Sequence, residues 1–149
     1  MLTITSPAII TNLEKLLTQV SDWLGSNGLT RRQTAKIELS LEEALVNVCR
    51  YAYHGGQGDV EVRCRITDGR DCLIEIIDSG IPFDACAHPA PELTACIADR
   101  KVGGLGVYLM RNMADQMTYR RENEKNILNL AFRTVPDRND GAAASPQRP

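Results

Sequence analysis

A carboxylate and a carboxamide stand four residues apart in the segment LSLEEALVNVCRYAY, as Glu43 and Asn47. On a helix, such positions lie on one face about one turn apart, whereas the adjacent Glu42 points about 100° away. A carboxylate and an amide in this arrangement are able to hold an oxygen-preferring cation and to orient a hydroxyl group. Taken alone, the pair is also what a solvated helical face shows, because polar pairs at this spacing are common.

A second polar motif follows the apolar run over residues 72–77, where Asp78 precedes Ser79 and Gly80. A carboxylate at the end of a strand can accept a hydrogen bond from an exocyclic amine, which would select adenine over guanine. The glycine permits a backbone turn that a side chain would obstruct. The alternative interpretation is an ordinary Asp-Ser-Gly turn that ends a strand.

A glycine-rich segment, Gly103-Gly104-Leu105-Gly106, stands at the start of an apolar helical pattern. Glycines at a helix N-terminus allow backbone N–H groups to approach an anion, and the helix dipole favours negative charge there. The segment lacks the Lys-Ser/Thr of a P-loop and the spacing of a dinucleotide-binding fingerprint. The alternative to anion binding is that the glycines form a flexible hinge. Arg100, which precedes them, could contact phosphates or remain solvated.

Two helices are expected in the N-terminal part of the chain, and the second of them carries the first motif. Ser6 as N-cap and Pro7 as first residue begin a predicted helix, in which apolar residues recur at helical spacing from Ile9 to Leu24 and which Gly25 to Gly28 end. Thr30 and Gln33 fit a capping box that opens a longer helix, ending at about residue 53. Glu43 and Asn47 are thereby placed in the second half of a long helix.

The other expected elements are a strand over 2–5, a hairpin of 60–66 and 72–77, a helix over 105–117, and an antiparallel pair of 118–121 and 127–134 across a turn at 122–126. This order, βααββαββ, predicts a two-layer α/β (α+β) sandwich with helices packed on one mixed, mostly antiparallel sheet. One domain over 1–135 is expected, with a lid at about 83–103 and a disordered tail over 136–149.

Composition excludes several classes of function. The chain of 149 residues has a net charge of −2, which gives no electrostatic footprint for nucleic acid or an anionic membrane. No apolar run approaches the ~20 residues of a membrane-spanning helix, so a cytoplasmic location is expected. The five cysteines contain no CxxC pair, which favours reduced thiols over a metal or redox site.

The three motifs, in this order within about 65 residues, resemble the Bergerat-type (GHKL, histidine-kinase-like) ATPase superfamily, which includes gyrase, MutL and histidine kinases. Within it, the chain is similar to the anti-sigma-factor serine/threonine kinases of the partner-switching type. The resemblance spans about residues 6–134. It is carried by EALVN at 43–47, DSGIPFD at 78–84 and RKVGGLGVYLMRNMAD at 100–115. It implies the Bergerat ATP-binding fold.

The resemblance also implies residue roles. Glu43 would be the catalytic general base, Asn47 would coordinate Mg²⁺, and Asp78 would bind the adenine amine. Gly80 would make room for the base, and the glycines would wrap the phosphates. The implied nucleotide-binding set is Asn47, Arg50, Asp78, Gly80, Arg100, Gly103, Gly104, Leu105 and Gly106. One departure is Tyr51, where relatives often carry a histidine.

The function implied by the resemblance is that of an ATP- and Mg²⁺-dependent protein serine/threonine kinase and anti-sigma factor. It would phosphorylate a STAS-domain anti-anti-sigma factor, bind a sigma factor and form a homodimer, without direct contact to nucleic acid or membrane. One alternative is a non-catalytic ATP-binding module, against which Glu43 argues, since binding alone needs no base. Another is a detached histidine-kinase catalytic domain, which usually follows a helical hairpin with a phosphoacceptor histidine.

Overall fold

The computed structural model describes residues 1–87 and 104–134. Their strands and α-helices are β1 (Leu2–Pro7), α1 (Leu13–Ser26), α2 (Arg31–Asn47), β2 (Asp59–Ile66), β3 (Cys72–Asp78), α3 (Gly104–Met113), β4 (Gln116–Glu122) and β5 (Lys125–Phe132). Most of the expected lid (88–103) and the expected tail (136–149) lie outside the described residues.

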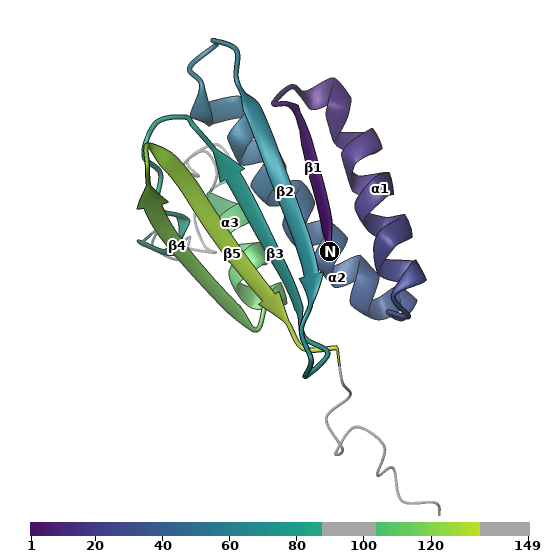
Figure 1. Ribbon diagram of the computed structural model, residues 1–149. Helices are drawn as coiled ribbons and strands as arrows, with labels where there is room; N and C mark the ends of the chain where they lie inside the picture. Colours follow the sequence, from purple (N-terminus) through teal and green to yellow (C-terminus); the bar gives the residue numbers. More distant parts are fainter. Residues whose placement is uncertain (88–103, 135–149) are drawn as a thin grey trace, which may run out of the picture.

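The strands form one sheet in the order β1-β2-β3-β5-β4, and the helices lie on one of its faces (Figure 1). The expected two-layer α/β sandwich is therefore confirmed. Every strand pairing in the described part of the chain is antiparallel, so the sheet there is simpler than the mixed one expected.

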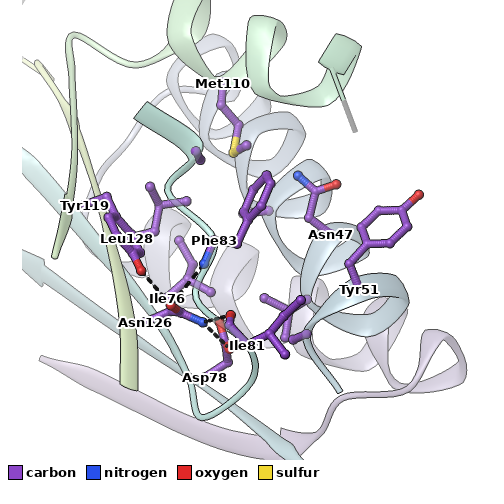
Figure 2. Close-up of a pocket in the computed structure, with 14 residues that line it drawn as sticks. Asn47, Tyr51, Ile76, Asp78, Ile81, Phe83, Met110, Tyr119, Asn126 and Leu128 are labelled. Carbon is purple, nitrogen blue, oxygen red and sulfur yellow. Dashed lines mark hydrogen bonds between the residues drawn. The ribbon is translucent and has the colours of Figure 1, made fainter. Parts of the chain in front are cut away.

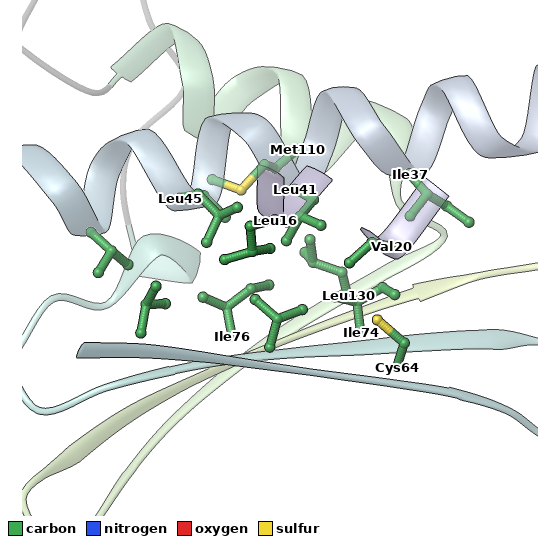
Figure 3. Packing of buried hydrophobic residues seen from close by; sticks show 14 of the residues in the cluster. Leu16, Val20, Ile37, Leu41, Leu45, Cys64, Ile74, Ile76, Met110 and Leu130 are labelled. Carbon is green, nitrogen blue, oxygen red and sulfur yellow. The ribbon is translucent and has the colours of Figure 1, made fainter. Parts of the chain in front are cut away.

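The core lies between the helices and the sheet, as Figure 3 shows. Leu41 and Leu45 of α2 and Met110 of α3 are fully buried over Ile74 and Ile76 of β3, each at most 2% exposed. Burial of a side chain of this size contributes about 1.5–3 kcal/mol to folding. This packing fixes α2 and α3 above the centre of the sheet.

Helix α2 begins with the expected capping box, because the Thr30 hydroxyl accepts from Gln33 N–H and the Gln33 side chain accepts from Thr30 N–H. The expected end of this helix at about residue 53 is nearly correct, but the helical geometry changes before that residue. After Asn47 the backbone continues as a π-helical turn, Val48–Ala52. Such turns occur often at functional sites because they redirect the side chains that follow.

The prediction for the start of the first helix is wrong. Ser6 and Pro7 belong to β1, where Pro7 pairs with Asp59 at the end of an edge strand, a position that tolerates a missing N–H. A 3₁₀ turn, Ile10–Asn12, follows, and α1 begins only at Leu13.

The end of the third helix was also predicted wrongly. Helix α3 stops at Met113, and Met117 lies in β4. The β4–β5 turn is formed by Asn123 and Glu124, whose φ angles of 51° and 61° are those of a two-residue hairpin turn. Asn126, which was expected in the turn, is therefore a strand residue.

The cysteines of the described residues are all free thiols, as expected. Cys64 and Cys72 are fully buried on neighbouring strands, and burial raises the pKa of each thiol to about 12. Cys96 lies outside the described residues. Within 1–87 and 104–134, no helix has the length and apolarity needed to cross a membrane.

Candidate functional site

A pocket opens between α2, the end of β3 and the last hairpin, with α3 above it (Figure 2). Its lining is mainly apolar and contains the two polar side chains that the sequence singled out, Asn47 and Asp78. It is lined by Ala44, Asn47, Val48, Tyr51, Ala52, Ile76, Asp78, Ile81, Phe83, Ala85, Met110, Tyr119, Asn126 and Leu128. An apolar slot with few convergent polar groups is typical of a small-molecule site.

Asp78, only 7% exposed, ends β3 inside this pocket. Its Oδ1 accepts hydrogen bonds from Gly80 N–H at 2.9 Å and from Asn126 Nδ2 at 2.9 Å. Its Oδ2 accepts none from the described residues. One carboxylate oxygen is therefore fixed by the protein, and the other remains an acceptor for a ligand.

Asn126 is the other buried polar side chain at this place, at 5% exposure. Its Nδ2 donates to Asp78 Oδ1 and to Ile81 O at 2.8 Å. Its Oδ1 accepts from Tyr119 Oη at 2.7 Å, from Arg121 Nη1 at 2.9 Å and from Phe83 N–H at 3.4 Å. The amide is thus hydrogen-bonded on both sides.

Sequence reasoning missed Asn126, Tyr119 and Arg121. A signal existed, because Asn126 alternates in phase with Leu128 and Leu130 on the core-facing side of β5. A polar residue at an apolar position of a strand is a reason to look for a buried partner. The misplaced turn at 122–126 hid it.

Gly80 has a packing role that the sequence did not reveal. A Cβ at this position would lie 2.3 Å from Ala52 O and 2.6 Å from Ala52 C, both backbone atoms. The next residue, Ile81, donates its N–H to the same Ala52 oxygen at 2.9 Å. The space freed by this glycine is therefore occupied by the π-helical turn, which is held against the Asp-Ser-Gly turn.

Tyr53 closes the same corner from outside the pocket. Its hydroxyl accepts from Ser79 N–H at 2.9 Å and donates to Asp59 O. Burial raises the pKa of the Tyr53 phenol, and the charges of Asp78 and Asp59 raise it further, whereas the Ser79 hydrogen bond lowers it. The hydroxyl therefore stays protonated at neutral pH and ties the Asp-Ser-Gly turn to β2.

Asn47 lines the pocket from the last turn of α2, and its buried Nδ2 has no hydrogen-bond partner among residues 1–87 and 104–134. An unsatisfied buried amide costs about 1–3 kcal/mol. The amide is therefore suited to a polar group that a ligand brings. Its oxygen is a ligand type that Mg²⁺ prefers, so this residue fits the ion.

Glu43 lies directly against the first turn of α3. A Cβ at Gly106 would come within 2.4 Å of Glu43 Oε2, so any other residue at this position would displace this carboxylate from its present place. A helix N-terminus favours negative charge close to it. The structure thus brings Glu43 next to Gly106 of the glycine segment.

The remaining expected site residues lie in different places. Gly104 begins α3, and Leu105 is 41% exposed. Arg100 and Gly103 lie outside the described residues. Arg50 is exposed and lines a separate groove between α1 and α2, while Tyr51 lines the pocket. The structure does not bring Arg50 into the pocket.

The mouth of the pocket is apolar, with Phe83 37% and Ile81 40% exposed. Arg111 of α3 donates to Cys86 O at 2.7 Å and so ties the 3₁₀ turn Ala85–Ala87 to this helix. The described residues hold no group of three or more His, Cys, Asp or Glu side chains able to bind a metal. An ion here would depend on oxygens supplied by its ligand.

Comparison with known proteins gives a consistent result. The model of the histidine kinase-like ATPase domain matches residues 6–132. The chain is 28% identical over 120 residues to the serine/threonine-protein kinase BtrW of Bordetella bronchiseptica, covering 77% of this chain and 84% of that protein.

Two solved structures share the fold. One contains the RsbU and RsbW domains of Rv1364c from Mycobacterium tuberculosis, with a TM-score of 0.65, 13% identity and 92% of this chain covered. The other is the blue-light activated histidine kinase EL346 of Erythrobacter litoralis, with a TM-score of 0.53, 17% identity and 71% covered. The present chain spans 34% and 32% of those longer chains.

Proposed function

This chain belongs to the histidine kinase-like ATPase domain family, and we propose that it is an ATP-dependent protein serine/threonine kinase that acts as an anti-sigma factor. Its substrate would be a STAS-domain anti-anti-sigma protein. The name of the relative BtrW, a serine/threonine-protein kinase, supports the choice of reaction within the family.

The observation that carries the proposal is the meeting of Asp78 and Asn47 in one apolar pocket. The pocket offers an acceptor at Asp78 Oδ2 for the adenine amine and apolar side chains for the faces of the ring. The amide of Asn47, whose Nδ2 has no partner among the described residues, would face the phosphates of a bound nucleotide. Gly104 and Gly106 would present backbone N–H groups of α3 to those phosphates, with Gly103 before them.

Transfer of the γ-phosphoryl group requires removal of a proton from the attacking serine or threonine hydroxyl. Glu43, beside Gly106 and one helical turn before Asn47, would accept that proton as general base. Asn47 would contribute an oxygen ligand to Mg²⁺, which would neutralise charge on the phosphates. Positioning and charge neutralisation would supply most of the catalysis.

The proposal extends to partners. A sigma factor would be bound when the STAS protein is absent or phosphorylated, and the chain would act as a homodimer in the cytoplasm. The structural similarity to a chain with an RsbW domain supports only the shared fold.

The test is ATP-dependent phosphate transfer to the cognate STAS-domain protein. Glu43→Gln should lower the transfer rate by about 100-fold or more, because a positioned base contributes that much. Glu42→Gln is the matched control, since Glu42 is exposed and lines the α1–α2 groove instead. Undiminished transfer by Glu43→Gln would remove this residue from the mechanism.

A second candidate function is a non-catalytic switch, in which bound nucleotide orders the lid and presents a surface to a partner. The contact of Glu43 with the first turn of α3 favours it, because the carboxylate could serve to position that helix. This candidate predicts Mg-ATP binding by the wild-type chain with no phosphate transfer to any STAS protein.

A further inference from the structure

The buried amide of Asn126 has a single orientation that its surroundings permit. Arg121 Nη1 and Phe83 N–H are donors only, and both point at Oδ1. Ile81 O is an acceptor only and receives Nδ2. Reversing the amide would set donors against donors and an acceptor against an acceptor, so Nδ2 must face Asp78.

This orientation determines which oxygen of Asp78 a ligand meets. Asp78 and Asn126 are directly paired in the register of β3 and β5. Nδ2 of Asn126 and N–H of Gly80 both donate to Oδ1, at 2.9 Å each. Two fixed donors on one oxygen hold the plane of the carboxylate, and Oδ2 is left towards the pocket as a pure acceptor.

The support behind Asn126 comes from the last hairpin. Tyr119 and Arg121, both on β4, hold the amide oxygen. Arg121 Nη1 also donates to Gly80 O at 3.1 Å, so one guanidinium fixes both the amide and the turn that follows Asp78. The hairpin thus fixes the carboxylate through Asn126, and its Tyr119 and Leu128 also line the pocket.

We propose that Asn126, held by Tyr119 and Arg121, is a positioning residue that sets the purine specificity of the site by presenting Asp78 Oδ2 as a fixed acceptor. A 6-amino purine donates to this oxygen, whereas the 6-oxo group of guanine would set an acceptor against it. Asn126 thereby selects a purine nucleotide that has an amino group at C6. This inference rests on the proposed function, because it assumes that a purine nucleotide occupies the pocket.

The test compares Mg-ATP with Mg-purine riboside triphosphate, which lacks the 6-amino group, by titration calorimetry on the full chain. The wild type should bind ATP about tenfold more tightly, the value of one hydrogen bond to a charged group. Asn126→Asp keeps the shape of the side chain but replaces its amide donor by an acceptor. The preference for ATP over the analogue should then fall to about twofold or less, while the affinity for purine riboside triphosphate should stay as in the wild type.

Asn129→Asp is the matched control, because it makes the same change on the same strand at an alternate, outward-facing position. It should keep the full preference for ATP. A general loss of folding in Asn126→Asp would lower the affinities for both ligands by the same factor and leave their ratio unchanged. Loss of positioning would instead lower the ratio.

An unchanged preference for ATP in Asn126→Asp that is still folded, whether or not both affinities fall, would overturn the positioning role. A wild type that binds both ligands equally would overturn it as well, while leaving ATP binding intact. A wild type that binds neither nucleotide would contradict the proposed function itself, and the inference with it.

Discussion

The two ends of the pocket are built differently. The strand end, comprising Asp78, Gly80, Tyr119, Arg121 and Asn126, is joined by hydrogen bonds from three strands. At the helix end, Asn47 lines the pocket, and Glu43 and Gly106 lie beside it where α2 contacts α3. The Asn47 Nδ2 has no partner in the part of the chain that the structure describes. Among the described residues, the buried amide of the strand end is hydrogen-bonded on both sides without a ligand, whereas the amide of the helix end has an unpaired Nδ2.

This difference shows how one site can combine recognition of a ligand with a change in stability when the ligand binds. A preorganised polar group binds its ligand without the cost of ordering it. An unpaired buried group makes the ligand-free form less stable, and a ligand that satisfies it stabilises the folded chain in proportion to its affinity. We therefore expect the strand end to select the base and the helix end to respond to the phosphates.

The largest effect should come from truncating the two asparagines. Asn126→Ala should lower the free energy of unfolding by about 3 kcal/mol, because Asp78, Tyr119 and Arg121 lose a buried partner. Asn47→Ala should raise it by about 1 kcal/mol, since it removes an unpaired buried amide and introduces a better helix former.

Urea unfolding of the ligand-free chain measures both values. The same substitution at the two ends controls for the change in side-chain size. Equal destabilisation by the two variants would break the comparison, because it would mean that the amide of the helix end is also hydrogen-bonded without a ligand.

A smaller effect is expected from Gly80→Ala. Its Cβ would meet the backbone of Ala52, which cannot move aside without shifting the π-helical turn, so unfolding should become easier by about 2 kcal/mol. Gly25→Ala in α1 is the control, because its Cβ would meet nothing within 4 Å. The control should be neutral or slightly stabilising by thermal unfolding. A tolerated Gly80→Ala would show that the strand end is adaptable.

The smallest change in stability is expected from Gly106→Ala. Its Cβ would meet the end of the flexible Glu43 side chain, which is able to turn away, so the free energy of unfolding should change by less than about 1 kcal/mol. The displaced carboxylate should nevertheless slow phosphate transfer about tenfold. Transfer at the wild-type rate would show that Glu43 acts from another position.

Local sequence patterns determined much of this protein. Alternation in β2 and β3, the capping box at Thr30 and Gln33, and the apolar stripe of α2 identified the elements, because each depends on neighbours within a few residues. The spacing of Glu43 and Asn47 placed both on one face of α2. The family resemblance then supplied Asp78 and the glycines.

Tertiary structure alone decided what surrounds those residues. Asn126 lies 48 residues after Asp78, and only the β3–β5 register brings them together. The role of Gly80 depends on the carbonyl of Ala52, and the place of Arg50 depends on the packing of α1 against α2. Hydrogen bonds and packing between distant segments are set by how the sheet and helices pair, and no local pattern encodes that pairing.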